Sequence, residues 1–194
     1  MKKIELVYRE ILYQALEQKN RVLTQAALAR ELTLSLSIVN QAVKHLEKIG
    51  AIRITPRSFH IVDARKILLY WASVRNLSKD ILYATRVEMP VTEIEKLMPE
   101  DAIYGAYSAY KFRFNDVPAD YSEVYIYSDE NLKQRFPEKR GPPNLLVLKK
   151  DNFMEKYGKT TTLAQTFVDL WNIREWYAKD FLTVLEVKLH GILE

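Results

Sequence analysis

The chain has 194 residues, of which 48% are hydrophobic and 28% are charged, a balance typical of a folded globular protein rather than a disordered one. It contains no cysteine, which excludes disulfides, thiolate metal sites and cysteine nucleophiles. The net charge of +4 is uneven, because residues 1–62 carry ten Lys and Arg against five Asp and Glu, whereas residues 63–194 carry nineteen against twenty; we therefore expect the first third to bind a polyanion.

Helical spacing of the apolar residues predicts three helices in the first part of the chain. The first covers residues 3–18, the second begins after Thr24 and turns Ala27 inward, and the third covers residues 35–49. Thr24 is a residue type that favours a helix N-cap, and Gly50 suits a C-terminal cap because it tolerates a left-handed backbone.

Two short apolar segments follow the third helix and predict a β-hairpin. Residues 51–54 and 59–62 flank the polar turn Thr55-Pro56-Arg57-Ser58. Short apolar runs on either side of a turn with Pro and Ser are typical of two paired strands. We therefore expect a hairpin over residues 51–62.

The segment LTQAALARELTLSLSIVNQAVKHLEKIGAIR, residues 23–53, resembles the helix-turn-helix of winged-helix transcription regulators. In those proteins a Thr-initiated helix containing Leu-Ala precedes a short turn and a Ser-x-Ser helix ending in Leu-Glu-x-x-Gly-x-Ile. The resemblance implies a winged helix-turn-helix domain over residues 1–62 that binds double-stranded DNA, with helix 35–49 in the major groove and the wing at 51–62. Many relatives carry Arg at the positions of Leu36 and Gln41, so its absence here implies weaker recognition of guanine.

The candidate DNA-binding residues divide by chemistry. Asn40 and Gln41 can each make bidentate contacts with adenine, and Ser37 can contact a base or a phosphate. Arg30, Lys44 and Lys48 are expected to contact phosphates, which position the protein without selecting sequence. The wing residues Arg53, Arg57 and His60 are expected to reach either the DNA backbone or the adjacent minor groove. The full set is Thr24, Gln25, Arg30, Ser35, Ser37, Asn40, Gln41, Lys44, Lys48, Arg53, Arg57 and His60.

A connecting helix is expected over residues 63–78. Asp63 is a candidate N-cap, and the apolar residues Ile67, Leu68 and Trp71 follow it at helical spacing. We expect this helix to link the first domain to a second domain over residues 79–194.

Strands and helices alternate in the second domain. Thr92-x-x-Glu95 has the pattern of a capping box, and β-branched and aromatic residues dominate the predicted strand at 123–127. Trp171 and Trp176 are expected on the buried sides of the last two helices. The predicted elements are a strand at 80–90, a helix from Thr92, a helix at 103–114, a strand at 123–127, a helix at 130–136, a strand at 144–150, and helices at 162–171 and 174–193. For residues 103–114 an extended conformation is the alternative to the preferred helix.

This order predicts an α+β protein, with an N-terminal winged helix-turn-helix followed by a small α/β domain that contains a mixed sheet. The second domain resembles that of AbiEi-type antitoxin regulators in the helix YGAYSAY (104–110), the two strands at 123–127 and 144–150, and TTTLAQTFVDLW (160–171). That resemblance implies a repressor with a toxin-like protein partner.

The same domain also resembles the nucleotidyltransferase fold in GAYSAYKFRF and ADYSEVYIYSDE. That family uses Asp-x-Asp on a strand to hold two metal ions. Here the strand offers Glu123 with Tyr125 or Tyr127, and tyrosine cannot replace a carboxylate in two-metal phosphoryl transfer. We therefore expect a degenerate domain without catalytic residues, and keep a nucleotidyltransferase-like enzyme as the alternative.

No other motif predicts chemistry. The sequence has no P-loop, no dinucleotide-binding glycine motif and no nucleophile elbow, and His45, His60 and His190 are too scattered to form a metal cluster. We expect no metal and no cofactor, although Tyr104, Tyr107 and Tyr110 are candidates to line a pocket for a small effector. The first helix carries charges where a signal peptide is apolar, and no stretch reaches the roughly 18 apolar residues of a membrane span, so we expect a cytoplasmic protein without a membrane segment.

The sequence thus predicts a DNA-binding transcription regulator of the repressor type that acts as a homodimer on palindromic sites. The second domain is expected to bind a protein partner or a small effector. A third interpretation makes the winged helix a protein-interaction module that does not bind DNA.

Overall fold

A computed structural model describes residues 1–193, with side chains described as far as Leu189. Within these residues the chain is a mixed α+β protein with eight α-helices, a four-stranded mixed sheet and a small antiparallel sheet. The chain forms two compact units. Unit 1 contains Met1–Arg75, Thr162–Ala164 and the end of the described chain from Leu185, and unit 2 contains Asn76–Thr161 and Gln165–Val184.

Four helices build most of unit 1. Thr24 caps the second, because its hydroxyl accepts a hydrogen bond of 3.1 Å from the amide of Ala27, and Ser35 caps the third with a 3.4 Å bond from the amide of Ile38. Such caps satisfy amides that have no partner inside the helix. The helices are α1 (Lys3–Leu16), α2 (Gln25–Glu31), α3 (Leu36–Lys48) and α4 (Ala64–Val74).

The core of unit 1 lies where α3 and α4 pack against α1. α3 buries Val39, Ala42, Val43 and Leu46, one stripe at helical spacing. Ala27, expected in this core, is exposed, because of the residues of α2 itself only Leu28 is buried. The expectation for Ala27 was therefore wrong.

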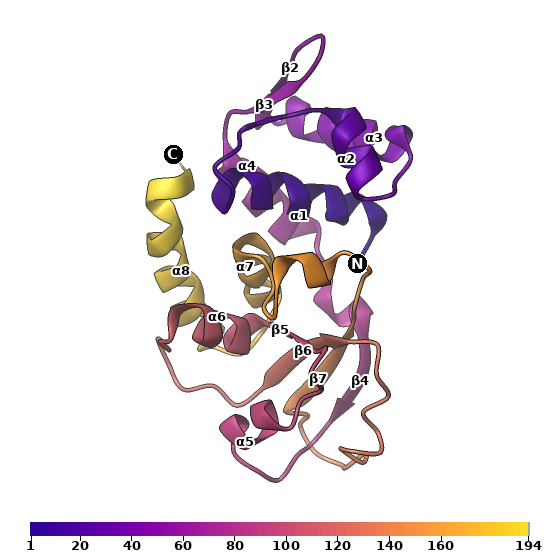
Figure 1. Cartoon of the computed structure of the whole chain (residues 1–194). Coiled ribbons are helices and arrows are strands. Elements are labelled where there is room, and N and C mark those ends of the chain that lie inside the picture. The colour runs from indigo at the N-terminus through magenta and orange to yellow at the C-terminus, as the bar shows by residue number, and fades with distance from the viewer. Residues whose placement is uncertain (194) are drawn as a thin grey trace. The chain divides into compact units, whose positions relative to one another are not determined.

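The small sheet of unit 1 has three strands in the order β1-β3-β2, all antiparallel. They are β1 (Val22–Leu23), β2 (Ile52–Ile54) and β3 (Phe59–Ile61). The hairpin of β2 and β3 closes at the predicted turn, where the amide and the hydroxyl of Thr55 each donate a 2.8 Å hydrogen bond to the carbonyl of Ser58. In Figure 1 this loop projects away from α2 and α3. The sequence did not predict β1.

Asp63 caps α4, and its replacement gives a simple test of this local structure. Its carboxylate accepts a 2.9 Å hydrogen bond from the amide of Lys66. Asp63→Ala removes this acceptor, and we expect a loss of about 1 kcal/mol in the free energy of unfolding, measured in urea. Asp63→Asn retains a capping oxygen and is the matched control. Equal losses in both variants would contradict the cap.

Unit 2 is built on the predicted mixed sheet, with strand order β4-β7-β6-β5. β6 and β7 are parallel, whereas β4 pairs with β7 and β5 with β6 in antiparallel fashion. The strands are β4 (Ile81–Thr85), β5 (Ile103–Gly105), β6 (Val124–Ser128) and β7 (Leu145–Lys149). Every residue of β6 is buried, as expected of a central strand covered on both faces.

Helices cover both faces of this sheet, and in Figure 1 α5 and α6 lie on opposite sides of it. Val124 and Ile126 pack in one core with Ile94 of α5. On the other face Tyr125 packs against Tyr107 of α6, at 6.1 Å between ring centroids. The helices are α5 (Val91–Lys96), α6 (Ala106–Phe114), α7 (Leu163–Trp171) and α8 (Ala178–Leu193), with short 3-10 helices η1 (Leu77–Asp80) and η2 (Met154–Tyr157).

Two predicted elements of unit 2 differ from the structure. The helix expected at 103–114 is split into β5 and α6, which begins only at Ala106. The helix expected at 130–136 is a run of turns with one helical hydrogen bond, from the amide of Phe136 to the carbonyl of Leu132.

Three residues of unit 2 also lie outside their predicted roles. α5 begins directly after Pro90, so Thr92 lies inside the first turn and forms no capping box. Trp171 ends α7 and is 47% exposed, while Trp176 lies in the turn before α8 and is 77% exposed. Neither tryptophan belongs to the core.

Candidate nucleic-acid interface

The exposed side of α3 presents one polar stripe. Ser37, Gln41, Lys44 and Lys48 are all exposed and follow one another at spacings of four, three and four residues. This spacing places them on one face of the helix, opposite the buried stripe of Val39 and its neighbours. The stripe can therefore offer hydroxyl, amide and ammonium groups together to one ligand.

Asn40 lies beside this stripe, is half-buried and is hydrogen-bonded to α2. Its amide nitrogen donates a 3.1 Å hydrogen bond to the side-chain oxygen of Gln25, the first residue of α2. One N–H and the carbonyl oxygen of Asn40 remain available, which is the donor–acceptor pair that adenine requires. The bond also holds both side chains in place, so Gln25 positions Asn40.

The hairpin adds a second exposed surface. Arg53 and His60 are opposite one another in the register of β2 and β3, and both are exposed. Cross-strand partners share a face of the sheet. The exposed Arg57 lies in the turn at the end of the hairpin. Val22 pairs with His60 on β3 and is 48% exposed, and it could not be predicted from the sequence because a two-residue strand has no periodic signal.

The predicted basic residues are free to contact an anion. None of them forms an ion pair or a side-chain hydrogen bond with any residue that the structure describes, and all are exposed. Glu31 and Glu47 lie on the same helices and offset part of this charge. The five basic residues are Arg30, Lys44, Lys48, Arg53 and Arg57.

The other predicted residues form the edge of this surface. Ser35 is exposed, while Thr24 and Gln25 are half-buried at the start of α2. His45, on the opposite edge of α3, has its Nδ1 3.3 Å from the hydroxyl of Tyr70 on α4. His45 is thus held toward α4. The side chain of His190 lies outside the described residues.

In unit 2 the residues expected from the nucleotidyltransferase resemblance lie around β6. Glu123 precedes the strand, and its carboxylate accepts a hydrogen bond from the hydroxyl of Tyr177. Burial raises the pKa of Glu123, while this hydrogen bond acts in the opposite direction. Tyr127 donates a 2.6 Å hydrogen bond to the carboxylate of Asp169. Tyr125 and Tyr127, which were paired with Glu123 at the metal positions of that family, are both buried, and Tyr125 lies in an aromatic cluster.

The tyrosines proposed to line an effector pocket fill the interior instead. Tyr107 and Tyr110 are fully buried, with ring centroids 4.9 Å and 5.3 Å from that of Phe181. Tyr104 is half-buried and donates a 2.7 Å hydrogen bond to the backbone carbonyl of Glu95. Burial is the main reason that the pKa of Tyr107 is raised. The expectation that these rings line a pocket was wrong for Tyr107 and Tyr110.

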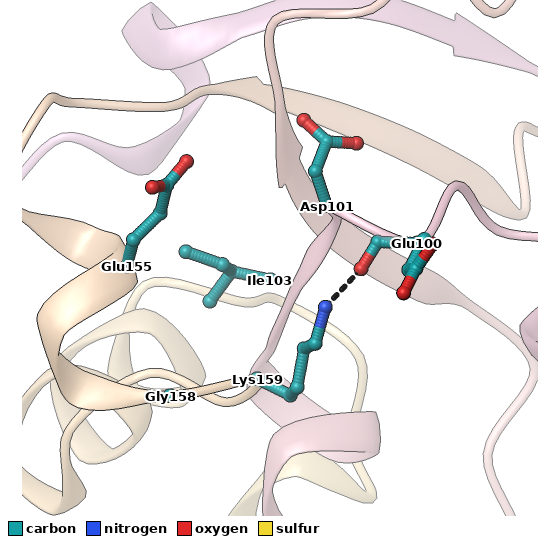
Figure 2. Close-up of a pocket in the computed structure, with 6 residues that line it drawn as sticks. All are labelled: Glu100, Asp101, Ile103, Glu155, Gly158 and Lys159. Carbon is teal, nitrogen blue, oxygen red and sulfur yellow. Dashed lines mark hydrogen bonds between the residues drawn. The ribbon is translucent and has the colours of Figure 1, made fainter.

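A cavity of about 410 Å³ opens between β5 and the segment that contains η2. Figure 2 shows its lining, in which the ammonium of Lys159 donates to the backbone carbonyl of Glu100. The buried Lys150 lies 3.2 Å from the carboxylate of Asp101 and 2.8 Å from that of Glu155. Two of the three carboxylates on this wall are therefore neutralised within the protein.

The described residues show two further negative results. They contain no group of three or more His, Cys, Asp or Glu side chains placed to hold a metal ion. Among them there is also no helix with the length and apolar content needed to cross a bilayer.

Comparison of the chain with protein-family models, with curated proteins and with solved structures finds no match. The assignment of a function to the surface of unit 1 therefore depends on its own residues. Two properties matter most: the polar stripe of α3 and the five exposed basic side chains around it.

Proposed function

We propose that residues 1–62 are a winged helix-turn-helix that binds double-stranded DNA. The order of elements supports this proposal, since α1, β1, α2, α3 and the hairpin of β2 and β3 follow one another as helices and strands do in that fold. The observation that carries it is the exposed stripe of α3, which combines the hydroxyl of Ser37 and the amide of Gln41 with two lysines that have no ion pair among the described residues. In the proposed complex, α3 occupies the major groove and the hairpin is the wing.

The proposed contacts divide into positioning and base recognition. The five exposed basic residues, Arg30, Lys44, Lys48, Arg53 and Arg57, contact phosphates, while Asn40 and Gln41 contact adenine edges. Leu36 is 55% exposed at the start of α3, and an apolar side chain in the major groove can pack against the methyl group of thymine. The surface therefore favours A·T over G·C pairs.

Electrophoretic mobility of a pooled random duplex at low salt tests the proposal. We expect retardation by the full chain, because phosphate contacts act on every sequence. Unchanged mobility would refute DNA binding and would favour a protein-interaction module for residues 1–62.

Base recognition is tested by Asn40→Ala combined with Gln41→Ala. We expect this variant to retain most of its binding to random duplex, and to lose its preference for the best duplex selected from a pool by about tenfold or more, since a bidentate pair discriminates by ~1–3 kcal/mol. Gln134→Ala, which removes an exposed amide in unit 2, is the matched control. If the double variant keeps the full preference, α3 is not docked as proposed.

The wider proposal is a transcription regulator of the repressor type that acts as a cytoplasmic homodimer. A dimer binds two DNA half-sites, whereas a monomer binds one. Analytical ultracentrifugation of the full chain tests whether the dimer forms. Unit 2 would then bind a partner, either a toxin-like protein or a small effector. Retention of a partner protein encoded beside this chain tests the first of these.

A nucleotidyltransferase-like enzyme stays the alternative from a different class. Its test is a divalent-metal-dependent transfer of a nucleotide that is lost in Glu123→Gln. Such a result would replace the regulator as the function of unit 2, while leaving DNA binding by unit 1 to be decided on its own measurement.

A further inference from the structure

Unit 2 has a second cavity, with a volume of about 190 Å³. The charged side chains that line it are mainly basic, whereas those of the first cavity are mainly acidic. One wall is apolar and belongs to the edge of the core, since Val87 and Phe136 are 7% and 4% exposed. The rim is basic. The lining residues are Arg86, Val87, Glu88, Met89, Leu97, Arg135, Phe136, Pro137 and Lys139.

The charges of this rim are not balanced within the protein. Arg86 forms an ion pair with Glu88, with 3.3 Å between Nε and Oε1. Neither Arg135 nor Lys139 forms an ion pair with any residue that the structure describes. The carboxylates of Asp101 and Glu155 in the larger cavity, by contrast, are both paired with Lys150. The small cavity thus keeps unmatched positive charge.

One hydrogen bond holds the guanidinium of Arg135 in place and leaves its other N–H donors available. Its Nη1 donates a 2.7 Å hydrogen bond to the backbone carbonyl of Leu97. A guanidinium has five N–H donors, and its planar fork matches the two oxygens of a carboxylate. Arg135 can therefore bind an anion while this bond persists.

Exposed apolar side chains complete the cavity. Met89 is 38% exposed and Leu97 is 45% exposed, and both line it. Covering them with an apolar ligand group would remove this surface from water. The volume is below the roughly 300 Å³ of pockets for drug-sized ligands, so the ligand must be small.

From this juxtaposition we infer that the cavity binds a small organic acid, whose carboxylate contacts Arg135 and Lys139 and whose short apolar chain packs on Val87, Leu97 and Phe136. This inference goes beyond DNA binding and does not depend on it. It identifies the class of small effector that unit 2 would take.

Titration of the isotopically labelled full chain with sodium pentanoate, followed by amide NMR shifts, tests this site. We expect saturable shifts at residues 86–89 and 135–139, weaker binding of acetate, which lacks the chain, and no binding of pentylammonium. Inorganic phosphate should also bind more weakly than pentanoate. If phosphate binds as tightly as pentanoate, apolar packing of the ligand chain does not contribute to binding. If pentylammonium binds as tightly as pentanoate, the site does not recognise a negative charge, and the inference is overturned.

Lys139→Gln supplies the variant, because the Lys139 side chain has no hydrogen bond or ion pair among the described residues to lose. We expect its dissociation constant for pentanoate to rise by about tenfold, as for loss of a charge-assisted contact. Lys79→Gln is the control, since Lys79 and Arg86 lie before and after β4, at its opposite ends. Equal weakening in both variants, or shifts confined to other residues, would overturn the site.

Discussion

Glu95→Ala is expected to lower the free energy of unfolding of unit 2 by about 4 kcal/mol, the range for breaking a buried charged network. Glu95 is 4% exposed and joins α5 to α6 and to the segment before β6. Its carboxylate accepts hydrogen bonds of 2.8 Å from Ser108, 2.5 Å from Lys111 and 2.7 Å from Tyr121. Alanine removes the acceptor and leaves these donors without it, which costs more than the loss of the bonds alone. Urea unfolding and amide hydrogen exchange of β6 measure the effect.

Glu93→Ala is the matched control on the same helix. Glu93 is bonded to Lys96 at 2.8 Å, but the two side chains are 51% and 70% exposed. An exposed ion pair of this kind contributes less than about 1 kcal/mol. If Glu95→Ala costs no more than Glu93→Ala, the carboxylate of Glu95 does not hold unit 2 together.

Replacing Lys44 and Arg57 together by Gln is expected to lower affinity for random duplex DNA by about 100-fold at low salt, counting ~1.5 kcal/mol for each charge-assisted contact. Lys44 belongs to the exposed stripe of α3, and Arg57 lies in the turn of the hairpin. The proposed complex places both against phosphates, so all sequences should weaken alike. Fluorescence anisotropy of a labelled duplex gives the affinities.

The control for this charge change is Lys79→Gln with Lys179→Gln. Both lysines are exposed residues of unit 2, so the net charge falls by the same amount. We expect little change in affinity. Similar weakening in the two double variants would mean that net charge alone drives binding, without a defined surface in unit 1.

The sequence predicts elements best where many residues repeat one pattern. The buried stripe of α3 and the apolar run of β7 both extend over several residues, and the structure confirms both elements. Prediction from the sequence fails for short elements that form only by pairing with a segment far away in the chain. β5 has three residues and exists through its pairing with β6, from Ile103 opposite Tyr127 to Gly105 opposite Tyr125.

The same distinction applies to the candidate surfaces: a pattern within one element can be predicted from the sequence, whereas a contact between elements cannot. Sequence patterns made Ser37, Gln41 and Lys44 candidates to contact DNA, and all three side chains are exposed. They could not predict that Asn40 is bonded to Gln25, because a contact between two helices has no signature within either one. The small cavity with the basic rim could not be predicted from the sequence either, since it depends on where the fold brings the loops after β4 and β6 together.

The salt dependence of binding to a pooled random duplex tests the central claim, that unit 1 binds DNA through its exposed basic residues. Release of counterions makes the logarithm of the affinity fall linearly with the logarithm of salt concentration, and five phosphate contacts predict a slope of about −4 to −5 for each protein chain bound. We expect this slope for the full chain, and a slope smaller by about two units when Lys44 and Arg57 are replaced by Gln. No binding at low salt, or a slope that the replacements leave unchanged, would contradict the claim.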